Sequence, residues 1–146
     1  MVVPLINVLA NETSGDAIAW IQVNNPLVKP DRYNEAIHTY RNLIPDYDCL
    51  LSVNDVKKYL FYGDKPINFK PYPWAKSQDL VNLCELNFAV CILKREDMIK
   101  WGSLVGDHPY FFFGDAEEFT DIDDLSAFRF CEMIYNQKKQ EILGLP

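Results

Sequence analysis

AIAWIQV at residues 17–23 and DCLLSV at residues 48–53 are two short, almost wholly apolar runs. Each is typical of a strand that is buried on both faces of a sheet. Between them, Asp31 is placed to cap a helix over 32–44, which Pro45 ends. Strand, helix and strand at this spacing predict a βαβ unit, in which two parallel strands are joined by a right-handed crossover.

The rest of the chain continues this alternation of strands and helices. Two β-rich runs split by Gly63-Asp64-Lys65 predict a hairpin excursion over 57–76. The other expected elements are the end of a helix near Asn11, a buried strand at 88–93, a helix at 95–104, a strand at 110–113 and a helix at 124–143 closed by Gly144. We therefore expect one α/β domain over 1–146 with a mostly parallel sheet. A doubly wound sheet usually opens with a strand that leads into a phosphate-binding loop, so a first strand at residue 17 predicts an N-terminally truncated fold.

Composition and charge narrow the classes of function. Fourteen basic and 21 acidic residues give a net charge of −7, which argues against non-specific binding to nucleic acid or to an anionic membrane. No apolar run approaches the roughly 18–20 residues of a membrane span. The chain has no GxGxxG, GxxxxGK[ST], HExxH or GxSxG motif, so we expect any chemistry to depend on carboxylates, amides and lysines. The four cysteines fit neither a zinc site nor a disulfide framework, and predict a reduced, cytoplasmic protein; they are Cys49, Cys84, Cys91 and Cys131.

The densest acidic cluster lies just before the last predicted helix. Asp121 and Asp123 alternate with apolar or neutral residues, so in an extended segment both carboxylates project to the same side. Mg²⁺ accepts one or two carboxylates and takes its other ligands from water and substrate phosphates. The alternative is that these acids only cap the helix or interact with its dipole, the role expected of Asp124.

Two further groups of polar residues are candidates for substrate binding. Gln22, Asn24 and Asn25 follow the first predicted strand, where open α/β sheets bind ligands, although an asparagine-rich turn is the alternative. Lys57 and Lys58 begin the excursion and could meet a substrate carboxylate or phosphate. Lysines at such a place also protect an edge strand from aggregation, so both interpretations remain open.

Four segments, in order, resemble the cytidylyltransferases of the acylneuraminate (CMP-sialic acid synthetase) type. They are DAIAWIQVNNPLVKPDRYNEAI at 16–37, DYDCLLSVNDVKKYLF at 46–61, KSQDLVNLCELNFAVCILKRED at 76–97 and EFTDIDDLSAF at 118–128. The first resembles the family's strand and Gln-Pro-Thr-Ser-Pro-Leu-Arg loop. The third resembles its Arg-Gln and Asn-Gly-Ala segment, and the fourth resembles its terminal Asp-Ile-Asp motif.

The resemblance implies a Rossmann-like domain that transfers CMP from CTP to the anomeric hydroxyl of a sugar acid, with Mg²⁺ and release of pyrophosphate. It implies that Asp121 and Asp123 bind the metal. Substrate-binding positions implied in the same way are Gln22, Gln78 and Asn87, together with Lys57 or Lys58. The excursion at 57–76 resembles the family's dimerisation segment, so a homodimer is expected.

The chain also departs from the family pattern. The family's Gly-rich N-terminal segment, which carries most contacts to the triphosphate, is absent, so we expect no turnover of CTP by this chain alone. Phe88 stands where the family has the glycine of Asn-Gly-Ala, and Ser77 stands where it has an arginine. The alternative hypotheses are a non-enzymatic α/β module that binds sugars or dimerises, and an unrelated binding module in which the acidic cluster is only a helix cap.

Overall fold

The computed structural model describes residues 2–43, 45–115 and 117–143, and its architecture is mixed α/β. Its helices are α1 (Val2–Glu12), α2 (Pro30–Leu43), α3 (Arg95–Trp101) and α4 (Leu125–Leu143), with a 3₁₀ turn at Ser77–Asp79. Its strands are β1 (Ala17–Ile21), β2 (Cys49–Val56), β3 (Phe61–Tyr62), β4 (Lys65–Pro66), β5 (Leu83–Lys94) and β6 (Pro109–Phe113). The expected closure of the last helix by Gly144 lies outside the described residues.

The main sheet is mixed, and the prediction of a mostly parallel sheet is wrong. Its strand order is β1-β5-β2-β6, with β5 antiparallel to both β1 and β2 and with β2 parallel to β6. β1 and β2 therefore run in the same direction, as the βαβ pattern predicted, but β5 lies between them. The excursion leaves from the end of β2 and returns directly into β5, and a chain that reverses in this way pairs antiparallel.

β1 is an edge strand rather than a strand buried on both faces. Ile18 and Trp20 are partly buried, whereas Ala17, Ala19 and Ile21 on the opposite face are exposed. An apolar run reports burial of side chains, but it does not distinguish a central strand from one that has a neighbour on one side only.

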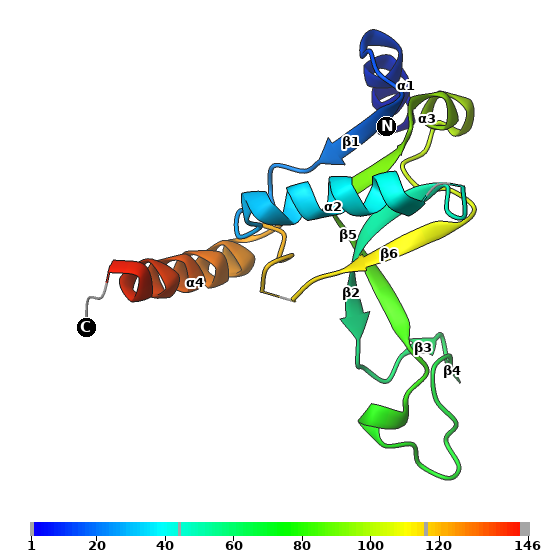
Figure 1. Cartoon of the computed structure of the whole chain (residues 1–146). Coiled ribbons are helices and arrows are strands. Elements are labelled where there is room, and N and C mark those ends of the chain that lie inside the picture. Colours follow the sequence, from blue (N-terminus) through cyan, green and yellow to red (C-terminus); the bar gives the residue numbers. More distant parts are fainter. Residues whose placement is uncertain (1, 44, 116, 144–146) are drawn as a thin grey trace.

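Helices cover the two faces of the sheet (Figure 1). Alternate residues of β2 point to opposite faces, so Leu51 and Val53 pack with α1 and α3 while Leu50 packs with α2. Buried residues from these helices complete the two cores: Ile6, Ala10 and Met98 on one face, and Ala36 and Tyr40 on the other.

A carboxylate fixes the parallel pair of β2 and β6. Asp48 Oδ2 accepts hydrogen bonds from the backbone N–H groups of Asp107 and His108, each at 2.8 Å, and the Asp48 N–H donates to the His108 carbonyl at 3.1 Å. Burial alone would raise the pKa of Asp48, but these donors outweigh it and the pKa is lowered. These hydrogen bonds of Asp48 set the register of β2 and β6, in which Cys49 lies opposite Pro109.

The excursion forms a separate lobe beyond the ends of β2 and β5 (Figure 1). β3 and β4 are two residues long each and pair antiparallel. Gly63 lies in the turn between them with a φ of +63°, in the left-handed region. Asn68 is 1% exposed and holds the lobe together: its Nδ2 donates to the Lys58 carbonyl, and its Oδ1 accepts the Leu60 N–H. The rings of Tyr59 and Trp74 stack on each other, and Phe69 meets both edge-on.

Candidate functional site

The loop after β1 lies against the acidic segment that precedes α4. The Ile122 N–H donates to the Asn24 carbonyl at 2.8 Å, and Asn24 Nδ2 donates to Asp123 Oδ1 at 3.4 Å. Asn25 Nδ2 donates to the carbonyl of Phe119 at 3.3 Å. Two sets of candidates almost a hundred residues apart are therefore brought together at the carboxyl end of an outer strand.

The buried side of this contact presents oxygen atoms. Asn25 is 4% exposed, and its Oδ1 has no hydrogen-bond partner in the described part of the chain. Asp121 is half-buried near Cys131 of α4. Burial of the Cys131 thiol and, after it, the negative charge of Asp121 raise the pKa of that thiol. Carboxylate and amide oxygens are the ligands that Mg²⁺ prefers, so the half-buried Asp121, the exposed Asp123 and the buried Asn25 each carry a suitable donor atom.

Three or more metal-binding side chains do not gather anywhere among the described residues, counting His, Cys, Asp and Glu. Asp121 and Asp123 are only two carboxylates. That number is compatible with Mg²⁺, which often uses one or two protein carboxylates and completes its shell with water and phosphate oxygens. Asp124 has the role expected of it, because its Oδ1 accepts the Ala127 N–H at 2.8 Å and caps α4.

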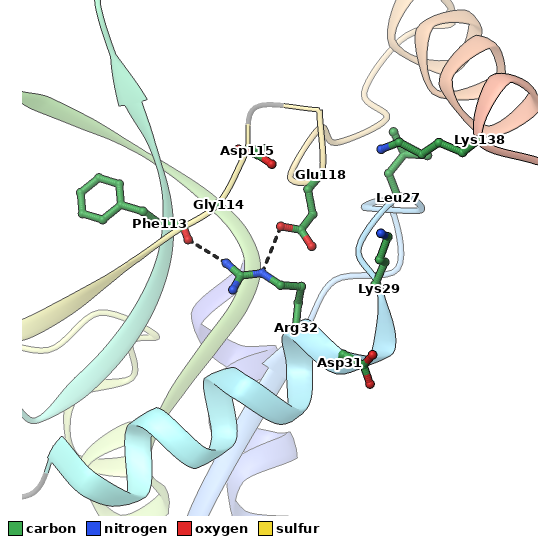
Figure 2. Close-up of a pocket in the computed structure, with 9 residues that line it drawn as sticks. All are labelled: Leu27, Lys29, Asp31, Arg32, Phe113, Gly114, Asp115, Glu118 and Lys138. Atoms are coloured by element: carbon green, nitrogen blue, oxygen red, sulfur yellow. Dashed lines mark hydrogen bonds and ion pairs between the residues drawn. The ribbon is translucent and has the colours of Figure 1, made fainter. Parts of the chain in front are cut away.

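A groove of about 560 Å³ lies next to this contact, between the end of β6 and the start of α2. Figure 2 shows Arg32 at its centre: Nη2 donates to the Phe113 carbonyl at 2.7 Å, and Nε donates to Glu118 Oε2 at 3.1 Å. The Arg32 guanidinium also pairs with Glu35 and lies 4.3 Å above the ring of Phe112. The groove is therefore built around a charged group whose three nitrogen atoms each donate one hydrogen bond within the protein.

Arg32 was not among the candidates from the sequence. An arginine two residues after a proline at a helix start has no distinguishing pattern, because its partners Phe113 and Glu118 lie more than eighty residues away. Lys29 and Lys138 also line the groove (Figure 2). Lys138 lies 3.6 Å from Glu117, whereas Lys29 makes no ion pair with the described residues.

Asn87 lies in the sheet and is 7% exposed. Its Oδ1 accepts hydrogen bonds from Ser52 Oγ at 2.6 Å and from the Ala89 N–H at 3.1 Å, and its Nδ2 donates to Asn54 Oδ1 at 3.1 Å. These bonds hold an irregularity in the pairing of β2 with β5 between Leu51 and Val53. The next residue, Phe88, has a φ of +56° and is the only non-glycine residue of the described ranges with a positive φ.

Gln22 is half-exposed in the same loop after β1, two residues before Asn24. The remaining candidate residues lie apart from this contact. Lys57 Nζ binds Asn82 Oδ1 at 3.0 Å and Asp55 Oδ2 at 3.1 Å where the lobe begins. Lys58 and Gln78 are exposed in the lobe. Within one copy of the chain, the structure does not bring the lobe residues to the acids near α4 (Figure 1).

No model of a known protein family matches this chain, and no match was found among the curated protein sequences. In the described part of the chain, none of the helices combines the length and hydropathy that crossing a bilayer requires.

Proposed function

We propose that this chain has the architecture of a sugar-acid cytidylyltransferase and that its site lies where the loop after β1 meets the acidic segment before α4. The reaction of that class is the transfer of CMP from CTP to a sugar acid, and this chain would provide the metal and sugar-acid side of the site. The proposal rests first on the four segments that resemble the acylneuraminate enzymes.

The observation that carries the proposal is the contact of Asn24 with Asp123 and Ile122. The resemblance assigns the loop of Asn24 to the sugar and Asp123 to the metal. A substrate whose phosphate meets the metal and whose sugar meets the loop needs both groups at one place. Ligands of α/β proteins commonly bind outside the carboxyl ends of strands, where this contact lies.

Phe88 provides a second and independent support. The family has a glycine at this position, and glycine is the residue that adopts a left-handed backbone without a steric penalty. Phe88 adopts that conformation, with a φ of +56°. The backbone of this chain therefore has the shape for which the family's glycine is suited, although the side chain differs.

The described residues suggest a role for each part of the site. Asp121, Asp123 and the buried Oδ1 of Asn25 would hold Mg²⁺, which when bound neutralises charge on the phosphates. Gln22 and the side-chain oxygen of Asn24 would bind hydroxyl groups of the sugar acid. Asn87 would shape the sheet rather than contact substrate, because both its Oδ1 and its Nδ2 already form hydrogen bonds within the protein.

Titration with Mn²⁺ tests the site directly, because free Mn²⁺ is measured by its paramagnetic resonance signal. We expect binding at millimolar metal, accompanied by a rise in the melting temperature. Asp121→Asn and Asp123→Asn should each weaken both effects, whereas Asp64→Asn, an exposed acid in the hairpin turn, should change neither. Absence of binding, or binding that all three variants retain, would refute the metal site.

An activity assay addresses the reaction itself. With CTP, an acylneuraminate and Mg²⁺, we expect no pyrophosphate release above background from these 146 residues, because they contain neither GxGxxG nor GxxxxGK[ST], two motifs that bind phosphates. Release that Asp121→Ala abolishes would show that this expectation is wrong and that the chain holds a complete site.

The lobe favours a second candidate, a non-enzymatic module that dimerises or binds sugars. Four of its aromatic side chains are more than half exposed, which is unusual unless a partner covers them: Phe61 58%, Tyr62 82%, Tyr72 90% and Trp74 68%. The homodimer that the resemblance implies would use this surface. Sedimentation of a Tyr72→Ser/Trp74→Ser variant tests it, and an unchanged oligomeric state would refute it.

A further inference from the structure

α4 is a helix of 19 residues, about 28 Å long, that projects from the domain beyond the sheet (Figure 1). Cys131 and Ile134 are 3% and 7% exposed and attach it to the domain. Other large apolar side chains of this helix remain in contact with solvent: Leu125 61%, Phe128 48%, Met133 57% and Tyr135 58%. A helix with apolar side chains beyond its buried stripe commonly packs against a further element.

One side of α4 combines apolar and charged residues in a regular order. Successive residues of a helix are rotated by about 100°, so Asp124, Phe128, Tyr135 and Lys139 lie along one side, next to the buried stripe. We call these four residues the α4 flank. A mostly apolar groove of about 230 Å³ runs beside it, between Phe128, Glu132 and Tyr135 on the helix and Pro26 and Leu27 on the loop after β1.

The α4 flank is complementary to itself in the antiparallel direction. If two copies of α4 are laid antiparallel so that Phe128 meets Tyr135, then Asp124 of each copy lies opposite Lys139 of the other. The rings of Phe128 and Tyr135 meet on both sides of the centre, where the two Glu132 side chains also approach each other, and an ion pair closes each end. Asp124 and Lys139, which would face their like charges in the parallel direction, face opposite charges in the antiparallel one. Lys139 makes no ion pair with the described residues of its own chain, and one oxygen of Asp124 remains after the capping bond.

We propose that the α4 flank is a docking surface for the α4 flank of a second copy of this chain, in an antiparallel arrangement with twofold symmetry. This surface is distinct from the lobe and does not depend on the proposed transferase function. The rings and the adjacent groove supply apolar area, while the terminal charges determine direction and register. The contact is smaller than a standard interface of about 800 Å² per partner, so we expect dissociation in the micromolar range.

Analytical ultracentrifugation of the full chain tests the surface. The lobe variant Tyr72→Ser/Trp74→Ser is the background for this test, because it leaves the α4 flank as the remaining proposed contact between copies. We expect this variant to form a concentration-dependent dimer, and adding Phe128→Glu should abolish that dimer, because two carboxylates would be buried without partners. A lobe variant that stays monomeric up to ~0.5 mM, well above the expected micromolar range, or a dimer that the added Phe128→Glu leaves intact, would overturn the proposal.

A charge exchange tests the direction without depending on how Phe128→Glu folds. Lys139→Glu and Asp124→Lys should each weaken self-association about tenfold at low salt, because like charges then face each other at both ends. Mixing the two variants should restore the association, because both ion pairs are present only in the mixed dimer. Arg129→Glu, the same charge change at an exposed site off the flank, is the control. A mixture that associates no better than its components would refute the antiparallel register.

Discussion

Because of the backbone conformation at Phe88, we predict that the protein is more stable with glycine than with alanine at this position of β5. Phe88→Gly and Phe88→Ala both remove the same aromatic ring, so the difference between them isolates the backbone. A left-handed conformation costs an ordinary L-residue about 1–2 kcal/mol, and glycine loses about 0.5–1 kcal/mol more conformational entropy on folding. With a φ of +56° at this residue, we expect the glycine variant to be more stable by roughly 0.5–1 kcal/mol.

Urea unfolding, followed by tryptophan fluorescence, measures this difference as a free energy of unfolding. In a thermal scan it corresponds to about 2–4 °C per kcal/mol for a chain of this size. Ala19→Gly is the matched control: Ala19 lies in β1, where no positive φ is found, so glycine there should cost about 0.5–1 kcal/mol. If Phe88→Ala is as stable as Phe88→Gly, the reasoning about the backbone at this position is wrong.

Three further predictions concern positions around the site. Asn87→Ala should lower the free energy of unfolding by about 2–4 kcal/mol, because buried hydrogen-bonding groups lose their partner; a change below 1 kcal/mol in urea unfolding would contradict this. Gly114→Ala should cost about 1–3 kcal/mol in the same assay, since a methyl group would lie 2.4 Å from the Phe119 ring; an unchanged midpoint would contradict it. The lowered pKa of Asp48 predicts that this group stabilises the fold above its ordinary pKa near 3.8 and that the contribution disappears as pH falls through the folded-state pKa. Wild type and Asp48→Asn should therefore differ in stability at pH 7 and converge in acid, and a gap independent of pH would exclude the carboxylate as its source.

Several features of the fold follow from local signals. The apolar run at 48–53 predicted β2, the aromatic run at 110–113 predicted β6, and Asp124 before the last amphipathic pattern predicted the cap of α4. Each of these depends on residues within one turn or one strand, so neighbouring residues suffice to indicate it.

The site shows the limit of such signals. The sequence singled out Asn24 and Asp123 separately, but only the path of the chain through β5, β2 and β6 brings them together. No local pattern marked Arg32 as a site residue, because its partners Phe113 and Glu118 come close to it only through this path of the chain. Asn87 was expected to meet substrate, and its bonds to Ser52 and Asn54 became visible only with the register of β2 and β5.

By itself, the amino-acid sequence indicated the helices and the strands of the main sheet and the polar residues at their ends, because hydrophobic period and capping act over a few residues. In the excursion, strand pairing is limited to two residues on each side. Only the tertiary structure decided that β5 runs antiparallel between β1 and β2, that β1 is an edge strand and that α4 projects from the domain. Strand order and direction depend on contacts between residues far apart in the chain, and no local pattern encodes which distant strand becomes a neighbour.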